Sequence, residues 1–456
     1  MPKKLPYAMS LILGPRVLIE TLGCKVNHYE SQGLASEFRR QGWQVVKKGP
    51  CEAVVINSCA VTAEAARQSL QAARRALKRY PEARVALAGC AVVAEPQKAA
   101  EIESLEVLCG NAGKKELVSR LTRQLEGMGA GQLDEIGIFG ELEIGLLRAD
   151  CERGRSRAVV KIQDGCNAFC RYCIIPYLRG RCRSLPPEKV LAECRGLAAA
   201  GFREVVLTGI HIGRYGEDVG AGFSLTSLLL QLVDEFPDLR LRLGSLQPHE
   251  ITPEITALLH DPQSPLCEHL HLSLQSASDR VLGAMGRPYR RSDIEKIFAL
   301  LDAGSGRLNI GTDLIVGFPA EDERAFRETL ALVEKVELGY LHVFPYSPRQ
   351  GTVAASWPDR VAGAEKKARA AELGALGRQK REVFITKNLG HALKVLLENG
   401  VDDSQYGTAW FGHSRNYLPV LVTNLDENDS LRAGSEATVR AYAWDGKRIQ
   451  ATLELV

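Results

Sequence analysis

The chain has 456 residues, enough for about three domains of roughly 150 residues each. Hydrophobic residues make up 45% of it and charged residues 25%, which are ordinary globular values and exclude a wholly disordered or fibrous chain. The 58 Lys and Arg nearly balance the 55 Asp and Glu, for a formal charge of +3, so overall charge does not by itself indicate nucleic-acid binding. No apolar run reaches the roughly 20 residues of a membrane-spanning helix, which excludes a spanning protein.

The amino terminus and the cysteine content together indicate a cytoplasmic protein. Residues 1–13 faintly resemble a signal peptide, but their apolar stretch is short and no small-residue cleavage site follows. The 12 cysteines lie in a chain far too long to need disulfide bonds for its stability. We therefore expect a cytoplasmic protein with no membrane association, whose cysteines bind metal.

The first part of the chain alternates short apolar runs with amphipathic stretches. The pattern predicts a helix over Ala63–Arg79, with Thr62 as its N-cap and Pro81 just beyond its end. Short runs rich in Val, Ile and Leu are typical of strands in a buried parallel sheet. The predicted strands are Val17–Cys24, Ala53–Cys59, Arg84–Cys90 and Leu105–Cys109. We predict a small α/β domain over residues 16–122.

A second alternating region follows a Gly-rich stretch at 125–150, which we interpret as a linker. Helices are predicted over Pro187–Ala200 and Arg291–Ala303. The predicted strands are Arg157–Gln163, Glu204–Gly209, Leu239–Leu246, His269–Gln275, Asn309–Gly317 and Tyr340–Tyr346. Six βα repeats predict a partial (β/α)6 barrel over residues 150–372.

The end of the chain changes character. A basic, Ala-rich helical stretch at 365–382 precedes short apolar runs that are separated by Gly, Asn and Asp. These runs are Ala392–Leu397, Tyr417–Val422, Glu436–Trp444 and Ile449–Leu455. They predict a small all-β, OB-like barrel over residues 384–455.

Three cysteines lie close together after the first strand of the predicted barrel. Cys166, Cys170 and Cys173 form a C-x3-C-x2-C run. A [4Fe–4S] cluster normally takes four cysteines, so three leave one iron open for a small molecule. The alternatives are a zinc knuckle that lacks its fourth ligand, or chance clustering.

Three further cysteines each end a predicted strand of the first domain. These are Cys24, Cys59 and Cys90, and they are far apart in sequence. Because the carboxyl ends of parallel strands meet at one edge of a sheet, the three thiols are expected to converge there. A second cluster and three buried structural cysteines remain alternative interpretations.

The sequence around these cysteines resembles the radical S-adenosylmethionine (SAM) methylthiotransferases. The first resemblance is carried by Gln163-Asp164-Gly165-Cys166-Asn167, by Cys173-Ile174-Ile175-Pro176-Tyr177, and by Arg179-Gly180 and Arg183-Ser184. The second is one Cys after each of the first three strands. The resemblance implies two [4Fe–4S] clusters and SAM as cofactors, with the first triplet holding the SAM-binding cluster and the second an auxiliary cluster.

The resemblance also implies where SAM binds. Polar groups at the carboxyl ends of barrel strands are where barrel enzymes keep their sites. A Gly there allows close approach of backbone to a ligand. The expected SAM-binding residues are Tyr172, Gly209, Arg242, Ser245 and Gln275. No side chain is assigned as a catalytic acid or base.

Several stretches favour one branch of the family, which acts on N6-threonylcarbamoyladenosine in tRNA. They are Leu22-Gly23-Cys24-Lys25-Val26-Asn27, Leu207-Thr208-Gly209-Ile210-His211 and His342-Val343-Phe344-Pro345-Tyr346-Ser347. The implied reaction replaces the hydrogen on C2 of that adenine, on the 3′ side of the anticodon, with a methylthio group. The alternatives are the same reaction on N6-isopentenyladenosine, and a non-catalytic Fe–S protein that binds RNA.

The implied partners are the anticodon stem-loop of tRNA, an electron donor such as flavodoxin or ferredoxin, and a sulfur donor. The carboxyl-terminal segment resembles a TRAM domain, an OB-like RNA-binding barrel. Candidate RNA contacts are Phe411, His413, Arg415, Asn416 and Tyr417, and the arginines Arg171, Arg179, Arg181 and Arg183. No role is assigned to Cys51, Cys109, Cys151, Cys182, Cys194 or Cys267.

Overall fold

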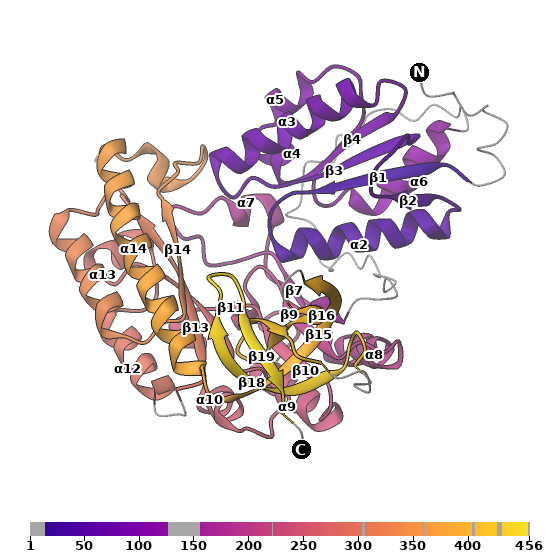
Figure 1. Ribbon diagram of the computed structural model, residues 1–456. Helices are drawn as coiled ribbons and strands as arrows, with labels where there is room; N and C mark the ends of the chain where they lie inside the picture. The colour runs from indigo at the N-terminus through magenta and orange to yellow at the C-terminus, as the bar shows by residue number, and fades with distance from the viewer. Residues whose placement is uncertain are drawn as a thin grey trace. The chain divides into compact units, whose positions relative to one another are not determined.

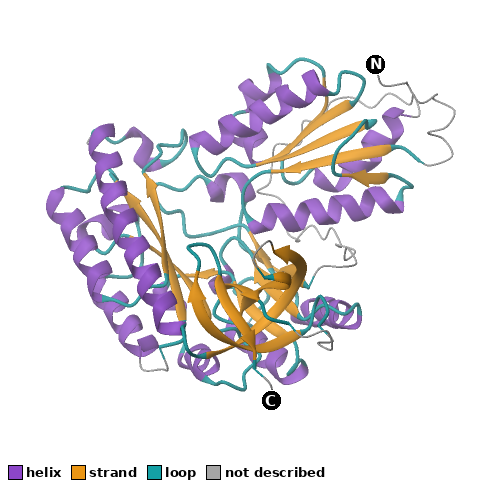
Figure 2. Cartoon of the chain, viewed as in Figure 1, coloured by secondary structure: helices purple, strands orange, loops and turns teal. Residues whose placement is uncertain are grey.

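The computed structural model describes residues 14–125, 156–220, 222–302, 306–358, 361–403, 406–425 and 431–454. They form two compact units (Figures 1 and 2). The first contains the described residues up to 125, together with Gln163–Ser184 and Ser347–Ala355. The second contains residues 156–162, Leu185–Tyr346 and the described residues from Ser356 onward. Residues 1–13, nearly all of the predicted linker and Cys151 lie outside the described residues.

The first unit is built on a parallel sheet of five strands, in the order β2-β1-β3-β4-β5. The strands are β1 Arg16–Thr21, β2 Gln44–Val46, β3 Ala53–Ser58, β4 Arg84–Gly89 and β5 Leu105–Cys109. The helices are α2 Lys25–Arg40, α3 Ala63–Arg79, α4 Cys90–Ala94, α5 Pro96–Ala100 and α6 Lys114–Leu125. The four predicted strands are confirmed, and the three-residue edge strand β2 was not predicted.

Helices cover both faces of this sheet, as a buried parallel sheet requires (Figure 1). One face packs against α2 and α6, through side chains such as Leu34, Phe38 and Leu121. The other packs against α3, α4 and α5. Helix α3 begins and ends as predicted, and the Thr62 hydroxyl accepts a hydrogen bond from the backbone N–H of Ala65 at 3.1 Å.

The second unit contains the six predicted barrel strands, all parallel. They form two adjacent groups, β10-β9-β6 and β11-β12-β13-β14. Their bounds are β6 Arg157–Lys161, β9 Glu204–Thr208, β10 Arg240–Leu243, β11 Ser245–Leu246, β12 His269–Gln275, β13 Asn309–Val316 and β14 Tyr340–Pro345. The predicted third strand is thus interrupted at Gly244, where β10 ends and β11 begins.

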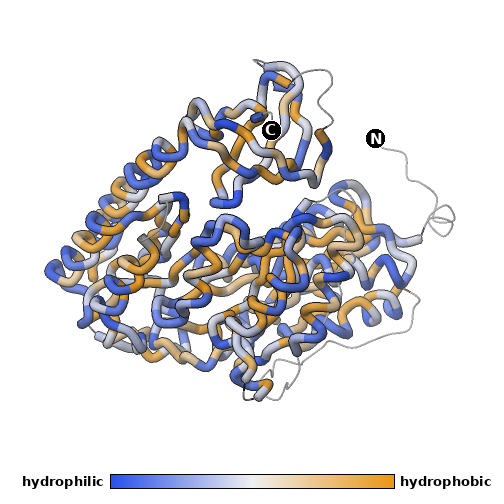
Figure 3. Tube along the Cα trace, turned by 90° about the horizontal axis from the view of Figure 1, so that it is seen from below, coloured by the Kyte–Doolittle hydropathy of each residue, from blue (hydrophilic) through white to orange (hydrophobic). Residues whose placement is uncertain are grey.

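Helices and short 3₁₀ turns connect the barrel strands. They are α8 Pro187–Ala199, η1 Ile212–Arg214, α9 Leu225–Glu235, η2 Pro248–Glu250, α10 Pro253–His260, α11 Asp279–Met285, α12 Arg291–Asp302, α13 Glu323–Lys335 and α14 Gly363–Asn388. No described helix is long and apolar enough to cross a membrane, and Figure 3 shows hydrophilic and hydrophobic residues interspersed along the helices.

A closed five-stranded barrel ends the second unit, in the order β15-β16-β17-β19-β18. Its strands are β15 Ala392–Asp403, β16 Gly407–Ser414, β17 Pro419–Val422, β18 Glu436–Trp444 and β19 Ile449–Leu453. Phe384 and Ile385 of α14 contribute to its apolar core. Strand β16 was not predicted, because its run Gly-Thr-Ala-Trp-Phe-Gly-His-Ser does not alternate cleanly.

The carboxyl-terminal barrel packs on the amino ends of the parallel strands. Asn309, the first residue of β13, donates to the carbonyl of Asn416 at 2.7 Å. Arg240, the first residue of β10, pairs with Glu436 at 3.1 Å, and Ser156 donates to the carbonyl of Leu397 at 2.9 Å. This leaves the carboxyl ends of the strands for ligands.

The segment 163–184 departs from the predicted domain division, because it groups with the first unit. It includes the two-stranded β7 Gln163–Asp164 with β8 Arg183–Ser184, and the short helix α7 Ile175–Arg179. Ile174 and Leu178 pack with Ala60 and Cys90 in one apolar cluster. These contacts fix the segment to the amino-terminal sheet.

Candidate cofactor site

The first unit brings three cysteines to the carboxyl edge of its sheet. Cys24, Cys59 and Cys90 follow β1, β3 and β4, which are neighbours in the sheet. Gly23 has φ +97°, and a Cβ there would lie 2.6 Å from the Cys59 sulfur. Burial raises the pKa of the Cys59 thiol, and the nearby thiols of Cys90 and Cys24 raise it further. The predicted convergence of the three cysteines is therefore observed.

Glycine at position 23 is required by this geometry. The positive φ is a conformation that other residues rarely adopt, and any side chain would meet Cys59. Cys59 and Cys90 are buried, at 6% and 4% exposure, whereas Cys24 is exposed. Two buried thiols and one exposed thiol make a site that is open on one side.

The second triplet lies in a loop closed at its base by the β7–β8 pair. Cys166 donates its N–H to the carbonyl of Gly180 at 3.0 Å, and Cys173 donates to the carbonyl of Cys170 at 2.8 Å. The N–H of Ala168 points at the Cys166 sulfur, 3.4 Å away. Backbone N–H groups directed at sulfur stabilise a thiolate, which is the form that binds metal.

Two residues of this loop have left-handed backbone conformations. Gly165 has φ +71°, and a Cβ there would lie 1.9 Å from the Arg181 carbonyl oxygen. Phe169, between the first two cysteines, has φ +45° although it is not glycine. Residues held in such sparsely populated conformations cluster at functional sites. Here they wrap the backbone so that the loop turns tightly around its three cysteines.

In neither cysteine triplet do all three sulfurs lie within 4.8 Å of one another. A zinc ion binds each thiolate at about 2.3 Å, which puts its sulfurs about 3.8 Å apart. Among the described residues, the group with three ligand atoms all within 4.8 Å of one another is His271, Asp313 and His342, and it includes no cysteine. The cysteine sulfurs are therefore too widely spaced for one zinc ion, which disfavours the zinc knuckle.

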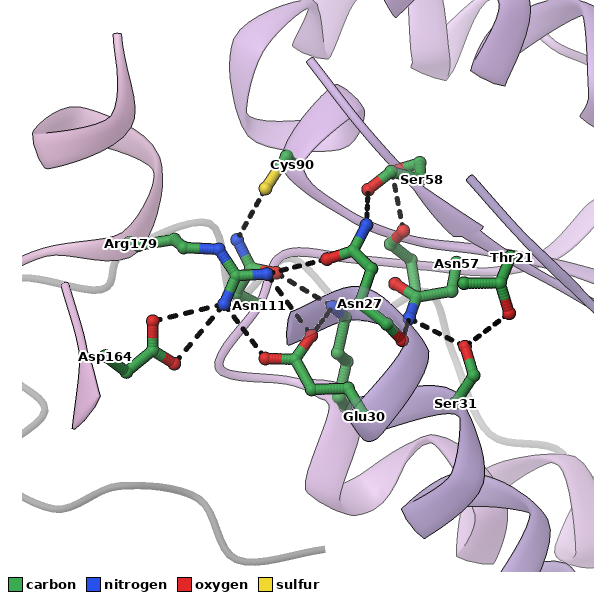
Figure 4. A network of polar contacts seen from close by, with 12 residues as sticks. Thr21, Asn27, Glu30, Ser31, Asn57, Ser58, Cys90, Asn111, Asp164 and Arg179 are labelled. Atoms are coloured by element: carbon green, nitrogen blue, oxygen red, sulfur yellow. Dashed lines mark hydrogen bonds and ion pairs between the residues drawn. The ribbon is translucent and has the colours of Figure 1, made fainter. Parts of the chain in front are cut away.

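A buried polar network connects Cys90 at the sheet edge to Asp164, two residues before Cys166 (Figure 4). Its centre is Arg179 of α7, which is 1% exposed. The guanidinium donates to Glu30 at 2.9 Å, to Asp164 at 3.1 Å and to the Asn27 side-chain oxygen at 2.7 Å. Lys114 donates to the other Glu30 oxygen at 2.6 Å.

The network ties helix α2 to the cysteine loop and to the sheet edge. Asn27, three residues after Cys24, donates to the carbonyl of Ser58 at 2.9 Å, next to Cys59. Asn111 donates to the Cys90 sulfur at 3.4 Å and to the carbonyl of Leu178 at 2.9 Å. The network therefore positions both cysteine triplets through shared partners.

The network carries an excess of positive charge. Arg179, Lys114 and Arg183 contribute three positive charges, and Glu30 and Asp164 contribute two negative charges. Burial acts to lower the pKa of Arg179, but Glu30 and Asp164 outweigh it and hold that pKa well above its usual range. Burial still raises the pKa of the Cys59 thiol, and the Arg179 charge acts against that rise.

This arrangement corrects the expectation that Arg179 and Arg183 meet RNA. Both are almost fully buried and paired with Asp164, whereas Arg171 and Arg181 are exposed. The sequence analysis also missed Glu30 and Asn27. Asn27 and Glu30 lie three and six residues after Cys24 on one helix, and this spacing could have indicated that they face the same side.

The predicted SAM-binding residues are distributed over both units. Tyr172 lies in the cysteine loop of the first unit. Gly209 directly follows β9, whereas Ser245 is the first residue of β11, two positions after β10 ends, and is exposed. Gln275 ends β12 with φ +67°, next to a shift in the register with β13. Strain at a strand end is a mark of a functional position.

Arg242 was expected to bind SAM, but its side chain is buried within the protein. It is 1% exposed, and its guanidinium pairs with Glu204 at 2.8 Å and donates to the carbonyl of Arg415 at 2.9 Å. It also lies over the ring of Tyr417, 4.7 Å from the centroid. Every face of the side chain is taken by the packing of the carboxyl-terminal barrel, so its role is structural.

The same packing corrects the expected RNA contacts of that barrel. Asn416 is 2% exposed, and Arg415 pairs with Glu436 at 3.1 Å. The ring of Tyr417 stacks on His413, 5.1 Å between centroids. Phe411 and His413 lie in strand β16 rather than in a loop, and both are half-buried. His413, Arg415, Asn416 and Tyr417 contact the parallel-strand part of the unit, whereas the ring of Phe411 packs on His413 within the barrel.

Comparisons with known proteins identify the family. Residues 16–110 match the model of an "uncharacterized protein family UPF0004", and residues 160–333 match that of the radical SAM superfamily. The chain is 36% identical to the threonylcarbamoyladenosine tRNA methylthiotransferase MtaB of Aquifex aeolicus, covering 84% of this chain and 92% of that protein. It is 32% identical to the protein of that name in Bacillus subtilis, covering 90% and 91%.

The chain belongs to the radical SAM methylthiotransferase family. It is an enzyme, a transferase whose cofactors are SAM and two [4Fe–4S] clusters. The tRNA-2-methylthio-N6-dimethylallyladenosine synthase of Moorella thermoacetica is also similar, at 33% identity over 83% of this chain and 86% of that protein. Both branches of the methylthiotransferases are thus represented among similar proteins.

A solved structure shares the fold. The radical SAM methyltransferase TsrM of Kitasatospora setae, with cobalamin and a [4Fe–4S] cluster bound, matches with a TM-score of 0.56 and 16% identity. The match covers 75% of this chain and 74% of that one. At this identity the likeness shows the α/β fold of a radical SAM enzyme alone.

Proposed function

We propose that this methylthiotransferase acts on N6-threonylcarbamoyladenosine in tRNA, on the 3′ side of the anticodon. It replaces the hydrogen on C2 of the adenine with a methylthio group and gives 2-methylthio-N6-threonylcarbamoyladenosine. The observation that carries the proposal is 36% identity, over most of both chains, to a protein with that name. The two converging cysteine triplets supply the ligands that the chemistry needs.

The cluster that binds SAM is assigned to Cys166, Cys170 and Cys173. The auxiliary cluster is assigned to Cys24, Cys59 and Cys90. When bound, the first group supplies reductive cleavage of SAM, and the second carries the sulfur that is transferred. Gly165 and Phe169 shape the loop that wraps the first group. Arg179 holds the loop on the amino-terminal sheet and places a fixed positive charge near Cys59 and Cys90 of the auxiliary set.

Tyr172, Gly209, Ser245 and Gln275 are assigned to SAM. Gly209 allows backbone to approach the ligand, and Ser245 and Gln275 offer polar groups at the carboxyl ends of the strands. Arg242 is withdrawn from this set. No side chain is assigned as a general acid or base.

The chain has three assigned domains. They are the methylthiotransferase domain at residues 16–122, the radical SAM domain at 150–372 and the TRAM domain at 384–455. The TRAM domain is assigned to bind RNA. The substrate is the anticodon stem-loop, and electrons come from a flavodoxin or ferredoxin. A separate sulfur donor restores the auxiliary cluster, and a tRNA substrate places the protein in the cytoplasm.

The test is mass spectrometry of nucleosides from tRNA incubated anaerobically with the reconstituted protein, SAM, reductant and sulfide. We expect 2-methylthio-N6-threonylcarbamoyladenosine, and its loss in a Cys166→Ala variant. Cys194→Ala is the matched control, because Cys194 is a buried cysteine of α8 outside both triplets. SAM cleavage without any methylthio nucleoside would reject the substrate and keep the radical chemistry.

The second candidate is the reaction on N6-isopentenyladenosine. The 33% identity to the Moorella thermoacetica synthase favours it, since this is close to the identities of the first group. The same mass spectrum distinguishes the two nucleosides. A third candidate, a non-catalytic RNA-binding Fe–S protein, predicts that SAM stays intact under reduction.

A further inference from the structure

A cluster of polar and aromatic side chains in the second unit lies outside the residues assigned to cofactors. It lies on strands β12, β13 and β14 and comprises His271, Asp313, Tyr340, His342 and Phe344. His271 and His342 both contact the same Asp313 oxygen, Oδ1, at 3.0 Å and 3.1 Å. We call this group the Asp313 cluster.

Strand alternation places the cluster on one face of the three strands. Leu341 of β14 packs toward Gly377 of α14, so Tyr340, His342 and Phe344 lie on the opposite face. The ring of Tyr340 occupies the space over Gly311, where a Cβ would lie 1.9 Å from it. The face covered by α14 is therefore apolar, and the opposite face carries the functional groups.

The hydrogen bonds of the cluster run in one direction. His271 Nε2 carries the proton because it faces a carboxylate, so in the neutral ring Nδ1 is an acceptor. Tyr340 donates to that Nδ1 at 3.0 Å and accepts from His269 Nε2 at 2.9 Å. The chain of donors ends on Asp313. These partners fix the ring orientation of His271 and the position of the carboxylate.

Asp313 is therefore held as an ionised acceptor with an open side. Burial raises its pKa, but the hydrogen bonds from His271 and His342 outweigh burial and lower that pKa to about 2. The contacts among the described residues all use Oδ1, which leaves Oδ2 for an external donor. The side chain is 26% exposed, so Oδ2 is within reach of a ligand.

Two residues of the cluster are exposed, and both lie in the carboxyl-terminal part of β14. The His342 side chain is 54% exposed and directs Nδ1 at Asp313, so its Nε2 faces outward. Phe344, two residues on, is 44% exposed, with its ring 6.3 Å from that of His342. An exposed aromatic ring beside a hydrogen-bonding imidazole is a surface on which a nucleobase stacks.

We propose that the Asp313 cluster binds the substituted edge of the target adenine and selects an N6 substituent that carries N–H and O–H groups. Asp313 Oδ2 accepts an N–H or O–H of a ureido-linked amino acid. His342 Nε2 accepts its hydroxyl when the ring is neutral and donates to its carboxylate when the ring is protonated. Phe344 stacks on the base.

This role of the Asp313 cluster rests on the proposed function and deepens it. It makes the cluster the part of the enzyme that distinguishes the two candidate nucleosides. An isopentenyl group offers neither a hydroxyl nor a second N–H to Asp313, so it leaves the carboxylate partly unpaired. A site built to bind polar groups rejects an analogue that lacks them far more strongly than an apolar pocket rejects a polar one.

A divalent metal ion is the competing occupant. Two imidazoles and a carboxylate with ligand atoms within 4.8 Å of one another suit a first-row divalent ion. The hydrogen bonds favour the nucleobase, because the N–H groups of both histidines already satisfy Oδ1 and the Tyr340 hydroxyl satisfies His271 Nδ1. The cluster is complete without a cation.

The experiment measures binding of three anticodon stem-loops to the reconstituted holoenzyme by fluorescence anisotropy. They carry threonylcarbamoyladenosine, isopentenyladenosine or adenosine at the same position. We expect the wild type to prefer the first over adenosine. Because a hydrogen bond to a charged group is lost, Asp313→Asn and His342→Phe reduce that preference about tenfold. His342→Gln, which keeps a hydrogen-bonding group, retains part of it.

His391→Phe is the matched control, since it makes the same change at an exposed histidine of the second unit. The readout is a ratio of dissociation constants, so a general loss of affinity cancels. Unchanged ratios in Asp313→Asn and His342→Phe, with threonylcarbamoyl RNA still methylthiolated, overturn the inference alone. Methylthiolation of only the isopentenyl RNA by the wild type overturns the proposed function.

The metal content of the same preparations tests whether a divalent ion, rather than a nucleobase, occupies the Asp313 cluster. We expect no divalent ion beyond the iron of the clusters, in the wild type or in Asp313→Asn. One equivalent of zinc, manganese or extra iron that is lost in Asp313→Asn, but kept in His391→Phe, would overturn the nucleobase site in favour of a metal site.

Discussion

At the residue scale, the first unit depends on a few side chains that no periodic pattern marks. Arg179 is fully buried and pairs with Glu30 and Asp164, which belong to segments more than 130 residues apart in sequence. Gly165 accommodates a carbonyl oxygen where any Cβ would collide. Sequence spacing identifies the cysteines, but these supporting residues become visible only through their contacts.

Replacement of Arg179 by Gln should destabilise the protein by about 3–5 kcal/mol, because it leaves Glu30 and Asp164 buried with too few partners. The free energy of unfolding in denaturant measures this. Arg171→Gln is the control, because Arg171 lies in the same segment and is exposed. Equal losses in the two variants would contradict the role given to the buried ion pairs.

Replacement of Gly165 by Ala should remove one of the two clusters. The new Cβ would meet the Arg181 carbonyl, and the positive φ is itself unfavourable, so the cysteine loop cannot keep its conformation. Iron and labile sulfide should fall by about half, as expected for loss of one of two [4Fe–4S] clusters. In the control Gly196→Ala, at an open position of α8, both should be unchanged.

At the element scale, a set of buried polar groups joins the carboxyl-terminal barrel to the parallel strands. Glu204 of β9 is fully buried and pairs with Arg240 and Arg242 of β10, which in turn contact β16 and β18 or the residues that follow them. Burial raises the pKa of Glu204, but Arg242 and Arg240 outweigh it and lower that pKa to about 2. The junction therefore depends on an ionised carboxylate.

This junction should be lost in acid. The pKa of Glu204 is lower in the folded chain than its ordinary value of 4.5, so its contribution to stability is complete above pH 4.5 and is lost as the pH falls toward 2. Thermal unfolding between pH 6 and 2.5 measures the dependence. Glu204→Gln should be less stable at pH 6 and should show a flatter decline, whereas a parallel decline would contradict this assignment.

At the scale of the whole molecule, the proposed function gives the two cysteine triplets separate tasks, although both belong to the first unit. The triplet Cys24, Cys59 and Cys90 comes from three strand ends, whereas Cys166, Cys170 and Cys173 come from one loop. Replacing either set by serine should halve the iron content and leave the other set loaded. The consequences for the reaction should differ.

Serine at the three strand-end positions should keep reductive cleavage of SAM and abolish methylthio product. Serine at the three loop positions should abolish both. Deoxyadenosine and methylthio nucleoside are measured in the same reaction by mass spectrometry. Loss of SAM cleavage in both variants, with half of the iron retained in each, would show that the two sets do not divide the chemistry in this way.

The sequence by itself determined the elements and the two cysteine sets. Apolar runs of fixed period locate strands such as β12 and helices such as α3, because burial of one face depends only on local spacing. The C-x3-C-x2-C run is local as well, so it was recognisable without a structure. The short edge strand β2 and strand β16 escaped because their apolar pattern is weak.

Which charged residues are internal partners became visible from the contacts between distant segments alone. Arg242 and Arg179 lie in the sequence where ligand-binding arginines were expected. In the structure each is neutralised by a carboxylate from a distant segment. Asp313, His271 and His342 come from three strands and meet because those strands are adjacent. Pairing between distant segments follows from strand order and packing, and neither is encoded in local spacing.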